Sequence, residues 1–315
     1  MTVLACDFGG TRLKIGIVRD GNVLAHSIAP AYSKQHLEPQ LPALKQTWLE
    51  LLERAGLSLH DCAGVAVAFP SIVDHATGRI LDQYGKYADC MDVDMRTWSR
   101  TEFGLPLAIE NDARMACIGE WRCGAGRGVD NLVMITLGTG LGTGVILHGR
   151  VLRGCHGQAG VLGGHTTVRY GGRACRCGNT GCAEAEASSA VLIDLAAARP
   201  DFSSSALAHE PVLDFAAVFR QADAGDACAL ALRDHALLVW SSVAVNLIHS
   251  YDPERIILGG GIMAAADVIL PAVREYVRTH AHTPWGEVQV EASTLRDQAA
   301  LVASEWLLAE QSIYF

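Results

Sequence analysis

The chain has 315 residues, which is long enough for two domains with buried cores. Half of the residues are hydrophobic and 19% are charged, which is typical of a globular protein and excludes a disordered one. A net charge of −9 argues against a nucleic-acid-binding surface, because backbone phosphates require a basic face. No apolar run reaches the roughly 18 residues of a membrane span, and no signal peptide is evident. We therefore expect a cytoplasmic protein whose ten cysteines are thiols or metal ligands.

The first motif lies at residues 2–18, TVLACDFGGTRLKIGIV, where an apolar strand (3–6) and a second apolar run (13–18) flank a polar turn. A carboxylate at the end of a strand can bind Mg²⁺, and paired glycines let backbone N–H groups approach a ligand. The candidate magnesium and phosphate ligands in this turn are Asp7, Gly9, Gly10, Thr11 and Arg12. In isolation, an ordinary β-hairpin explains the pattern equally well.

The second motif, residues 134–147 with the sequence MITLGTGLGTGVIL, repeats this arrangement about 130 residues later. A strand again leads into a turn rich in Gly and Thr, with Gly138, Thr139 and Gly140 as candidate phosphate ligands, and a strand follows. The repetition predicts a duplicated fold in which ATP is held in the cleft between the two halves.

Between these motifs, residues 62–69 form a predicted buried strand, and Asp94 is placed to cap a helix over 95–103. A short strand, 107–109, then ends in Glu-Asn-Asp before a helix that begins near residue 113. Open α/β sheets place their chemistry at the carboxyl ends of strands. Two side chains there can accept from sugar hydroxyls, Asn111 and Asp112. The alternative, that Asp112 only caps the helix, is equally compatible with its position.

The C-terminal half contains predicted helices over 185–198, 215–222 and 227–250. A buried strand (255–258) then runs directly into three glycines, of which Gly259 and Gly260 are candidate adenine contacts. A simple loop into the next helix is the alternative. The last predicted helix, 297–310, has apolar positions on one side and is expected to pack back on the N-terminal half.

Residues 165–184, HTTVRYGGRACRCGNTGCAE, contain a full set of tetrahedral zinc ligands. The set comprises His165, Cys175, Cys177 and Cys182, and it leaves no coordination position open for water. A closed site of this kind is structural, so zinc is expected to fix the loop from which Glu184 projects. The alternative is chance clustering of three cysteines that are buried as small apolar groups.

These motifs together resemble the ROK family (repressor, open reading frame, kinase) over nearly the whole chain. The motifs that carry the resemblance are Asp7–Thr11, Leu137–Gly142, Glu110–Ala113, Asp252–Gly261 and the zinc signature from Gly164 to Glu184. The resemblance implies the α/β actin/hexokinase-like ATPase fold, which contains a ribonuclease H-like motif, with two duplicated domains and an interdomain cleft. It places a small domain at 1–113, joined by helix 297–310, and a large domain at 114–296.

By resemblance the chain is an ATP-dependent kinase that phosphorylates a hexose or hexose derivative and uses ATP, Mg²⁺ and a structural Zn²⁺. Asp112 would then be the general base, and Asn111, His165 and Glu184 would contact the sugar. Repressors of the family carry a winged helix before the first phosphate motif, and its absence before Asp7 favours the kinases. A homo-oligomer, either a dimer or a tetramer, is implied in the same way.

The chain departs from the family pattern at two places. Leu162 stands where the kinases usually have a glutamate that binds sugar hydroxyls, and Gln158 is the nearby side chain that could partly replace it. In residues 84–94 the usual sugar-binding asparagine is not evident. The sequence therefore leaves open which sugar is bound and which hydroxyl reacts, and the rival hypothesis is a ROK-type sugar sensor without catalysis.

Overall fold

The computed structural model describes residues 1–311 and divides into two compact units. Unit 1 contains residues 1–128, 151–161 and the described residues from 295 onward, and unit 2 contains 129–150 and 162–294. Helix α3 (Asp112–Cys123) and segment 151–161 thus fall in unit 1, whereas the predicted domain boundary after residue 113 placed residues 114–123 and 151–161 in the second domain. The domain limits given above stay a prediction.

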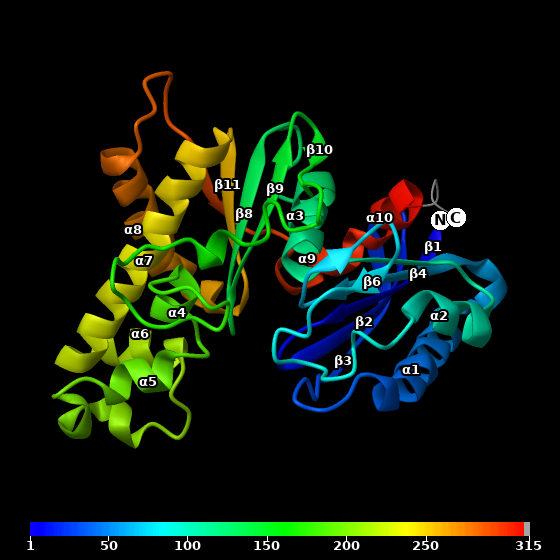
Figure 1. Ribbon diagram of the computed structural model, residues 1–315, viewed down its shortest axis with the longest axis horizontal. Helices are drawn as coiled ribbons and strands as arrows, with labels where there is room; N and C mark the ends of the chain where they lie inside the picture. The colour runs from blue at the N-terminus through cyan, green and yellow to red at the C-terminus, as the bar shows by residue number, and fades with distance from the viewer. Residues whose placement is uncertain (312–315) are drawn as a thin grey trace. The chain divides into compact units, whose positions relative to one another are not determined.

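Unit 1 is built on a five-stranded mixed sheet with the order β3-β2-β1-β4-β7 (Figure 1). The strands are β1 (Thr2–Phe8), β2 (Arg12–Arg19), β3 (Asn22–Pro30), β4 (Cys62–Phe69) and β7 (Leu107–Asn111). Strands β1, β2 and β3 pair antiparallel, whereas β4 and β7 extend the sheet in parallel from β1. The parallel strands β1 and β7 therefore end at the same edge, where Asp7 and Asn111 lie.

Apolar residues alternate between the two faces of this sheet, and each face packs against a different set of helices. On one face, Leu4, Cys6 and Phe8 pack in a cluster with Trp48 of α1 (Leu41–Arg54). On the other face, Val3 packs with residues of α3, α9 (Ala299–Val302) and α10 (Ser304–Gln311). The C-terminal region thus completes the N-terminal core, as the sequence predicted.

Unit 2 repeats the topology of unit 1 with the strand order β10-β9-β8-β11-β12. The strands are β8 (Leu132–Leu137), β9 (Leu141–Leu147), β10 (Arg150–Val151), β11 (Arg255–Gly259) and β12 (Gln289–Ala292). Strands β8 and β9 form an antiparallel hairpin, and β11 and β12 continue in parallel beside β8. The duplication inferred from the two glycine-rich turns is therefore confirmed at the level of strand order.

The helices of unit 2 gather around α7 (Ala227–Tyr251), which packs against α6 (Phe215–Asp223), α8 (Ala266–His280) and strand β8 (Figure 1). Helix α7 is long and apolar enough to cross a membrane by length and composition, and 56% of that stretch is buried inside the fold. A buried core helix meets the same criterion, so this is weak evidence for a membrane span.

The prediction of one continuous helix over 185–198 was wrong. The structure has two short helices, α4 (Ala183–Ala187) and α5 (Leu192–Ala197), with a break between them. In the break, the N–H of Ser189 donates to the carbonyl of Gly138 and the N–H of Ala190 to that of Thr139. These amides bind the second glycine-rich turn and do not continue a helix, which local propensity could not indicate.

The helix predicted over 297–310 is also interrupted, into the 3₁₀ helix η7 (Arg296–Gln298), α9 and α10. Other predicted elements are confirmed. Asp94 caps α2 (Met95–Phe103) by accepting from the N–H of Thr97, and α6 and α7 begin at the expected residues.

Candidate functional site

The first glycine-rich turn joins β1 to β2 and is closed by a hydrogen bond from the N–H of Gly9 to the carbonyl of Arg12, 3.0 Å long. Asp7 precedes it near the end of β1, as expected, and is buried. Its Oδ2 lies 3.1 Å from Nζ of Lys14, which the sequence analysis did not identify. Burial raises the pKa of Asp7, and the charge of Lys14 opposes that rise only in part.

Two hydroxyl groups, those of Tyr87 and Ser33, form hydrogen bonds with carbonyls of this turn. The hydroxyl of the fully buried Tyr87 lies 3.0 Å from the carbonyl of Ala31 and 3.3 Å from that of Gly9. The hydroxyl of Ser33 donates to the carbonyl of Gly10 over 2.5 Å. Sequence reasoning missed both residues, because neither lies in a motif and each reaches the turn only through the tertiary fold.

Asn111, the last residue of β7, caps helix α3. Its Oδ1 accepts from the N–H of Arg114 over 3.0 Å, and its Nδ2 donates to the carbonyl of Ser71 and to Oδ1 of Asp112. The alternative in which Asp112 only caps the helix is therefore wrong, since Asn111 occupies that role. The carboxylate of Asp112 is therefore available for a role other than capping the helix.

Asp112 accepts hydrogen bonds from Nδ2 of Asn111 (3.1 Å) and from the N–H of Ala113 (2.8 Å), both at Oδ1. Among residues 1–311, no hydrogen bond reaches its Oδ2, so one oxygen remains to accept a proton. Burial raises the pKa of Asp112 to about 6, while the nearby Lys86 acts in the opposite direction. A carboxylate with that pKa is ionised at neutral pH and is more basic than an exposed one.

A buried ion-pair network surrounds the residues before and after Asp112. Glu110 and Arg114 are both fully buried, and Nη1 of Arg114 lies 2.6 Å from Oε1 of Glu110. Nη2 of Arg114 donates to the carbonyls of Gly157 and Ala159, 2.8 Å each. Segment 151–161, which contains the exposed Gln158, is thereby fastened to α3 within unit 1.

The second glycine-rich turn, between β8 and β9, is tied to helix α4 within unit 2. The N–H of Leu141 donates to Oε2 of Glu184 over 2.9 Å. The turn itself is closed by a bond from the N–H of Gly138 to the carbonyl of Gly140, 3.0 Å. Glu184 thus extends from the end of the predicted zinc loop to the backbone of the turn, a contact that the sequence did not indicate.

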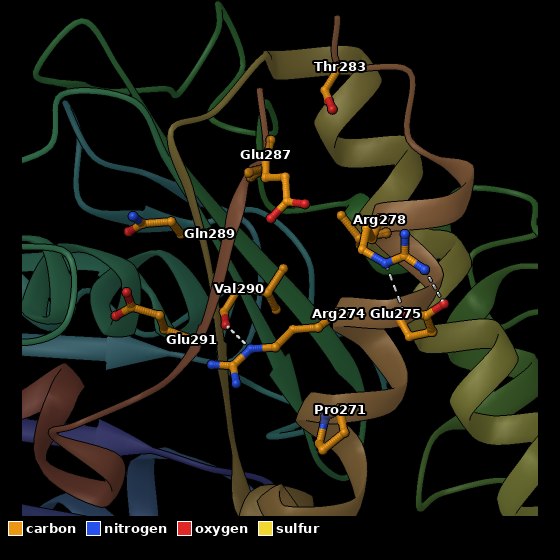
Figure 2. A pocket seen from close by; sticks show the side chains of 11 residues that line it. Pro271, Arg274, Glu275, Arg278, Thr283, Glu287, Gln289, Val290 and Glu291 are labelled. Carbon is orange, nitrogen blue, oxygen red and sulfur yellow. Dashed lines mark hydrogen bonds and ion pairs between the residues drawn. The ribbon is translucent and has the colours of Figure 1, made fainter. Parts of the chain in front are cut away.

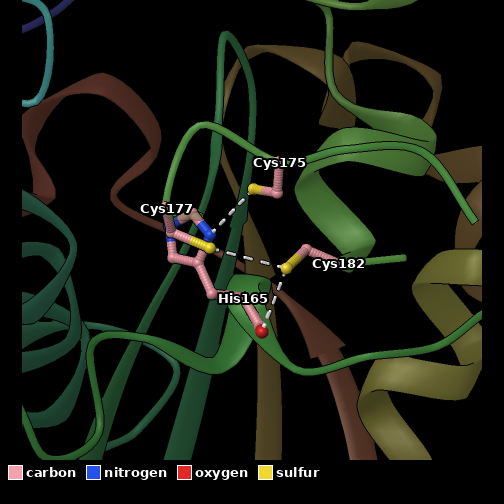
Figure 3. A group of neighbouring side chains, drawn as sticks. All are labelled: His165, Cys175, Cys177 and Cys182. Carbon is pink, nitrogen blue, oxygen red and sulfur yellow. Dashed lines mark hydrogen bonds between the residues drawn. The ribbon is translucent and has the colours of Figure 1, made fainter. Parts of the chain in front are cut away.

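The four predicted zinc ligands come together in unit 2, and their ligand atoms all lie within 4.8 Å of one another (Figure 3). Sγ of Cys175 lies 3.5 Å from Nδ1 of His165, and Sγ of Cys177 lies 3.6 Å from Sγ of Cys182. Ligand atoms around a tetrahedral zinc are roughly 3.3 to 3.8 Å apart. These two separations fit Zn²⁺, and the convergence of all four ligand atoms argues against chance clustering.

The loop around this cluster is held by backbone pairing and by one buried carboxylate. Thr167 and Cys182 form an antiparallel bridge, and Gly181 between them has φ +68° with its Cα against the carbonyl of Arg169, where a Cβ would have no room. Buried Glu186 accepts from the N–H of Arg173 over 2.7 Å. Nε2 of His165, on the side away from Cys175, lies 4.0 Å from Oε1 of Glu184. The ligand cluster, Glu184 and the second turn are thus continuous in unit 2.

The third glycine segment follows β11. Gly260 has φ +91°, and a Cβ there would lie 2.3 Å from the carbonyl oxygen of Leu137, so only glycine allows this approach to the end of β8. No heavy atom beyond the chain neighbours lies within 4 Å of the position that a Cβ would take on Gly261. The segment therefore places exposed backbone beside the second turn, and both alternatives given for it remain open.

A surface pocket of about 400 Å³ lies elsewhere in unit 2, between α8 and β12 (Figure 2). Arg274 crosses it and donates from Nε to the carbonyl of Val290 over 2.8 Å, which covers the open edge of β12. None of the predicted site residues lines this pocket. Its lining is explained by protection of an edge strand.

The sequence-predicted residues thus form one group in each unit. Unit 1 contains Asp7, Gly9, Gly10, Thr11, Arg12, Asn111, Asp112 and Gln158. Unit 2 contains Gly138, Thr139, Gly140, His165, Cys175, Cys177, Cys182, Glu184, Gly259 and Gly260. The side chains of Thr11 and Arg12 are exposed. Leu162, at the site of the missing glutamate, is half-buried at the start of the 3₁₀ helix η3 (Gly163–His165).

Two similarly built sheets, each with a glycine-rich turn between its first two strands, define a protein of the actin/hexokinase-like ATPase fold. The ROK family model matches residues 3–311. A glucokinase of Halalkalibacterium halodurans is 32% identical over 81% of this chain and 78% of its own length. A glucokinase of Thermotoga maritima is 30% identical over 99% of this chain and 98% of its own.

Among solved structures, a ROK family glucokinase from Streptomyces griseus, crystallised with glucose and AMPPNP, superposes with a TM-score of 0.79. It is 26% identical, and the match covers 97% of this chain and 99% of that one. The chain belongs to the ROK family, and the resemblance seen in its motifs is confirmed.

Proposed function

We propose that this chain phosphorylates a hexose or hexose derivative with ATP, with Asp112 as the general base. The chain is an ATP-dependent sugar kinase of the ROK family. The observation that carries the base assignment is the state of Asp112: it is buried beside the cap of α3, one of its oxygens has no hydrogen bond among the described residues, and its pKa is raised to about 6. Phosphoryl transfer needs alignment and charge neutralisation, and a positioned base contributes typically about 10²- to 10⁴-fold.

The nucleotide would be held by backbone N–H groups of the glycine-rich turns. Asp7 is suited to bind Mg²⁺ directly or through water, because hard cations prefer carboxylate oxygens and this one is buried at the end of a strand. Mg²⁺ neutralises the charge on the transferred phosphates. Lys14 adds a second positive charge beside Asp7, and Tyr87 and Ser33 keep the turn in one conformation.

The zinc would take no part in the reaction. His165, Cys175, Cys177 and Cys182 fill a tetrahedral set, so their function is to fix residues 165–184. Support comes from the bond between Glu184 and the N–H of Leu141, through which the fixed loop reaches the second turn. His165, Glu184, Asn111 and Gln158 are the proposed sugar contacts. Leu162 argues for a sugar that carries an apolar or substituted edge at that position.

A direct test is incubation of the purified protein with ATP, Mg²⁺ and a panel of hexoses and 2-acetamido hexoses while ADP is followed. We expect ADP with one or a few of the sugars. Tight binding of a sugar without any ADP would instead support the non-catalytic sensor. Hydrolysis that does not depend on sugar would contradict both hypotheses.

We further infer a cytoplasmic location, since all ten cysteines are unbridged, as they are in reducing compartments. The negative net charge supports a protein without nucleic-acid partners. A dimer or tetramer is the expected assembly, and light scattering after gel filtration tests it.

A further inference from the structure

Arg114 has an extensive buried hydrogen-bond network to which the proposed mechanism assigns no role. This side chain lies in the first turn of α3, two residues after Asp112, and is fully buried. Its Nη2 donates to the carbonyls of Gly157 and Ala159, 2.8 Å each, and these two residues flank Gln158. One guanidinium group therefore fixes the backbone on both sides of a candidate sugar ligand.

Glu110 connects the same segment a second time. Its Oε1 accepts from Nη1 of Arg114 (2.6 Å) and from the N–H of Asn111 (2.9 Å). Its Oε2 accepts from Nε of Arg153 over 2.7 Å, and the carbonyl of Arg153 in turn accepts from the N–H of Ala159. Residues 153–159 are thus closed by their own hydrogen bond and are anchored at one end to Glu110 and at the other to Arg114, which pairs with Glu110.

The stability of the fold alone does not explain this buried ion pair. Burying an ion pair costs desolvation, and apolar side chains of similar volume are often as stable or more so. Arg114 also leaves its buried Nε without a hydrogen-bond partner. Two buried charges are retained where packing could be apolar, so a role in geometry explains them better than a role in folding.

We propose that Arg114 and Glu110 are positioning residues for the sugar: through the carbonyls of Gly157 and Ala159 they hold Gln158 in a fixed relation to Asp112. The inference rests on the proposed function, because Asp112 and Gln158 are its proposed base and sugar ligand. The planar guanidinium is essential here, since a lysine can pair with Glu110 but cannot span two carbonyls and a carboxylate with the same geometry.

The test compares Arg114→Lys with Arg96→Lys, using D-glucose or the panel sugar that gives the highest rate. Arg96 is a matched control, because it also donates to two backbone carbonyls in unit 1, those of His75 and Ala76. We expect Arg114→Lys to raise KM for the sugar by about tenfold and to leave KM for ATP within about twofold. The control should change neither KM. In a Gln158→Ala background, Arg114→Lys should have a much smaller effect on the sugar KM.

Calorimetric measurement of sugar affinity tests the positioning role of Arg114 separately from the kinase activity. Sugar binding by the wild-type protein without turnover would refute the kinase, and a weaker affinity in Arg114→Lys would still support the positioning role. An unchanged sugar affinity, or a parallel rise of both KM values, would overturn the inference. If Arg114→Lys does not fold, Arg153→Lys tests the same network from its more accessible side, with the same direction of effect expected and an unchanged sugar KM contradicting it.

Discussion

Two loops carry the proposed sugar ligands, and the protein holds them by opposite chemistry. Residues 165–184 in unit 2 converge on three thiols and an imidazole whose ligand atoms lie within 4.8 Å of one another. Residues 153–159 in unit 1 are held by a buried arginine and glutamate and by backbone hydrogen bonds. We propose that the first loop depends on a bound zinc ion, which can be removed, whereas the second is held by side chains of the protein itself. Metal ligation and buried hydrogen bonding are thus two different proposed ways of fixing a loop that carries sugar ligands.

The largest effect is expected from Asp112→Asn, which should remove the proposed base without disturbing either loop. Asp112→Asn keeps Oδ1 for the N–H of Ala113 and for Asn111, so both loops should stay in place while the base is lost. Turnover should fall by about 10²- to 10⁴-fold with zinc content unchanged. Steady-state kinetics and metal analysis measure this, and a variant with wild-type turnover would refute the base assignment.

Removal of the metal should affect one loop and spare the other. We expect Cys182→Ser to abolish stoichiometric zinc and to lower kcat/KM by about 10- to 100-fold, because the backbone around Glu184 loses its anchor. Cys123→Ser is the control, since this half-buried thiol at the end of α3 lies outside both the cluster and segment 153–159. Elemental analysis and kinetics report the result. Full activity without zinc would show that the position of residues 165–184 does not depend on the metal.

The pH dependence sharpens the assignment in unit 1. Because the base must be ionised, kcat/KM should fall as the pH decreases through about 6, the raised pKa of Asp112. Lys86 lowers that pKa, so Lys86→Met should move the acidic limb to higher pH. A pH–rate profile of both proteins checks the direction. A limb that stays in place, or moves to lower pH, would show that Lys86 does not act on the base.

The smallest effect is expected at the outer end of the ion-pair network. Glu310 binds Arg153 from α10, and its side chain is 31% exposed, so water can replace much of the pair. Glu310→Gln should leave the sugar KM within about twofold of the wild-type value. A large rise in that KM would mean that segment 153–159 depends on α10 more than on Arg114.

Local pattern was enough to predict several parts of the site. The two glycine-rich turns, the Asp94 cap and the cysteine spacing are each encoded within a few consecutive residues, and the structure has all three. The predicted helix over 185–198 failed because the amides of Ser189 and Ala190 bind a turn that lies about fifty residues earlier in the chain. No periodicity in the segment itself carries that information.

The sequence by itself identified the candidate residues for binding phosphate, metal and a proton, and the duplicated strand–turn–strand pattern that bears the glycine-rich turns. Only the tertiary structure decided how these groups are held. Tyr87 against Gly9 and Arg114 against Gly157 and Ala159 join segments that are distant in sequence, and Lys14 meets Asp7 across the pairing of β1 with β2. Their roles come from burial and from hydrogen bonds made across the fold, because a side chain's partners and its pKa depend on what surrounds it in space.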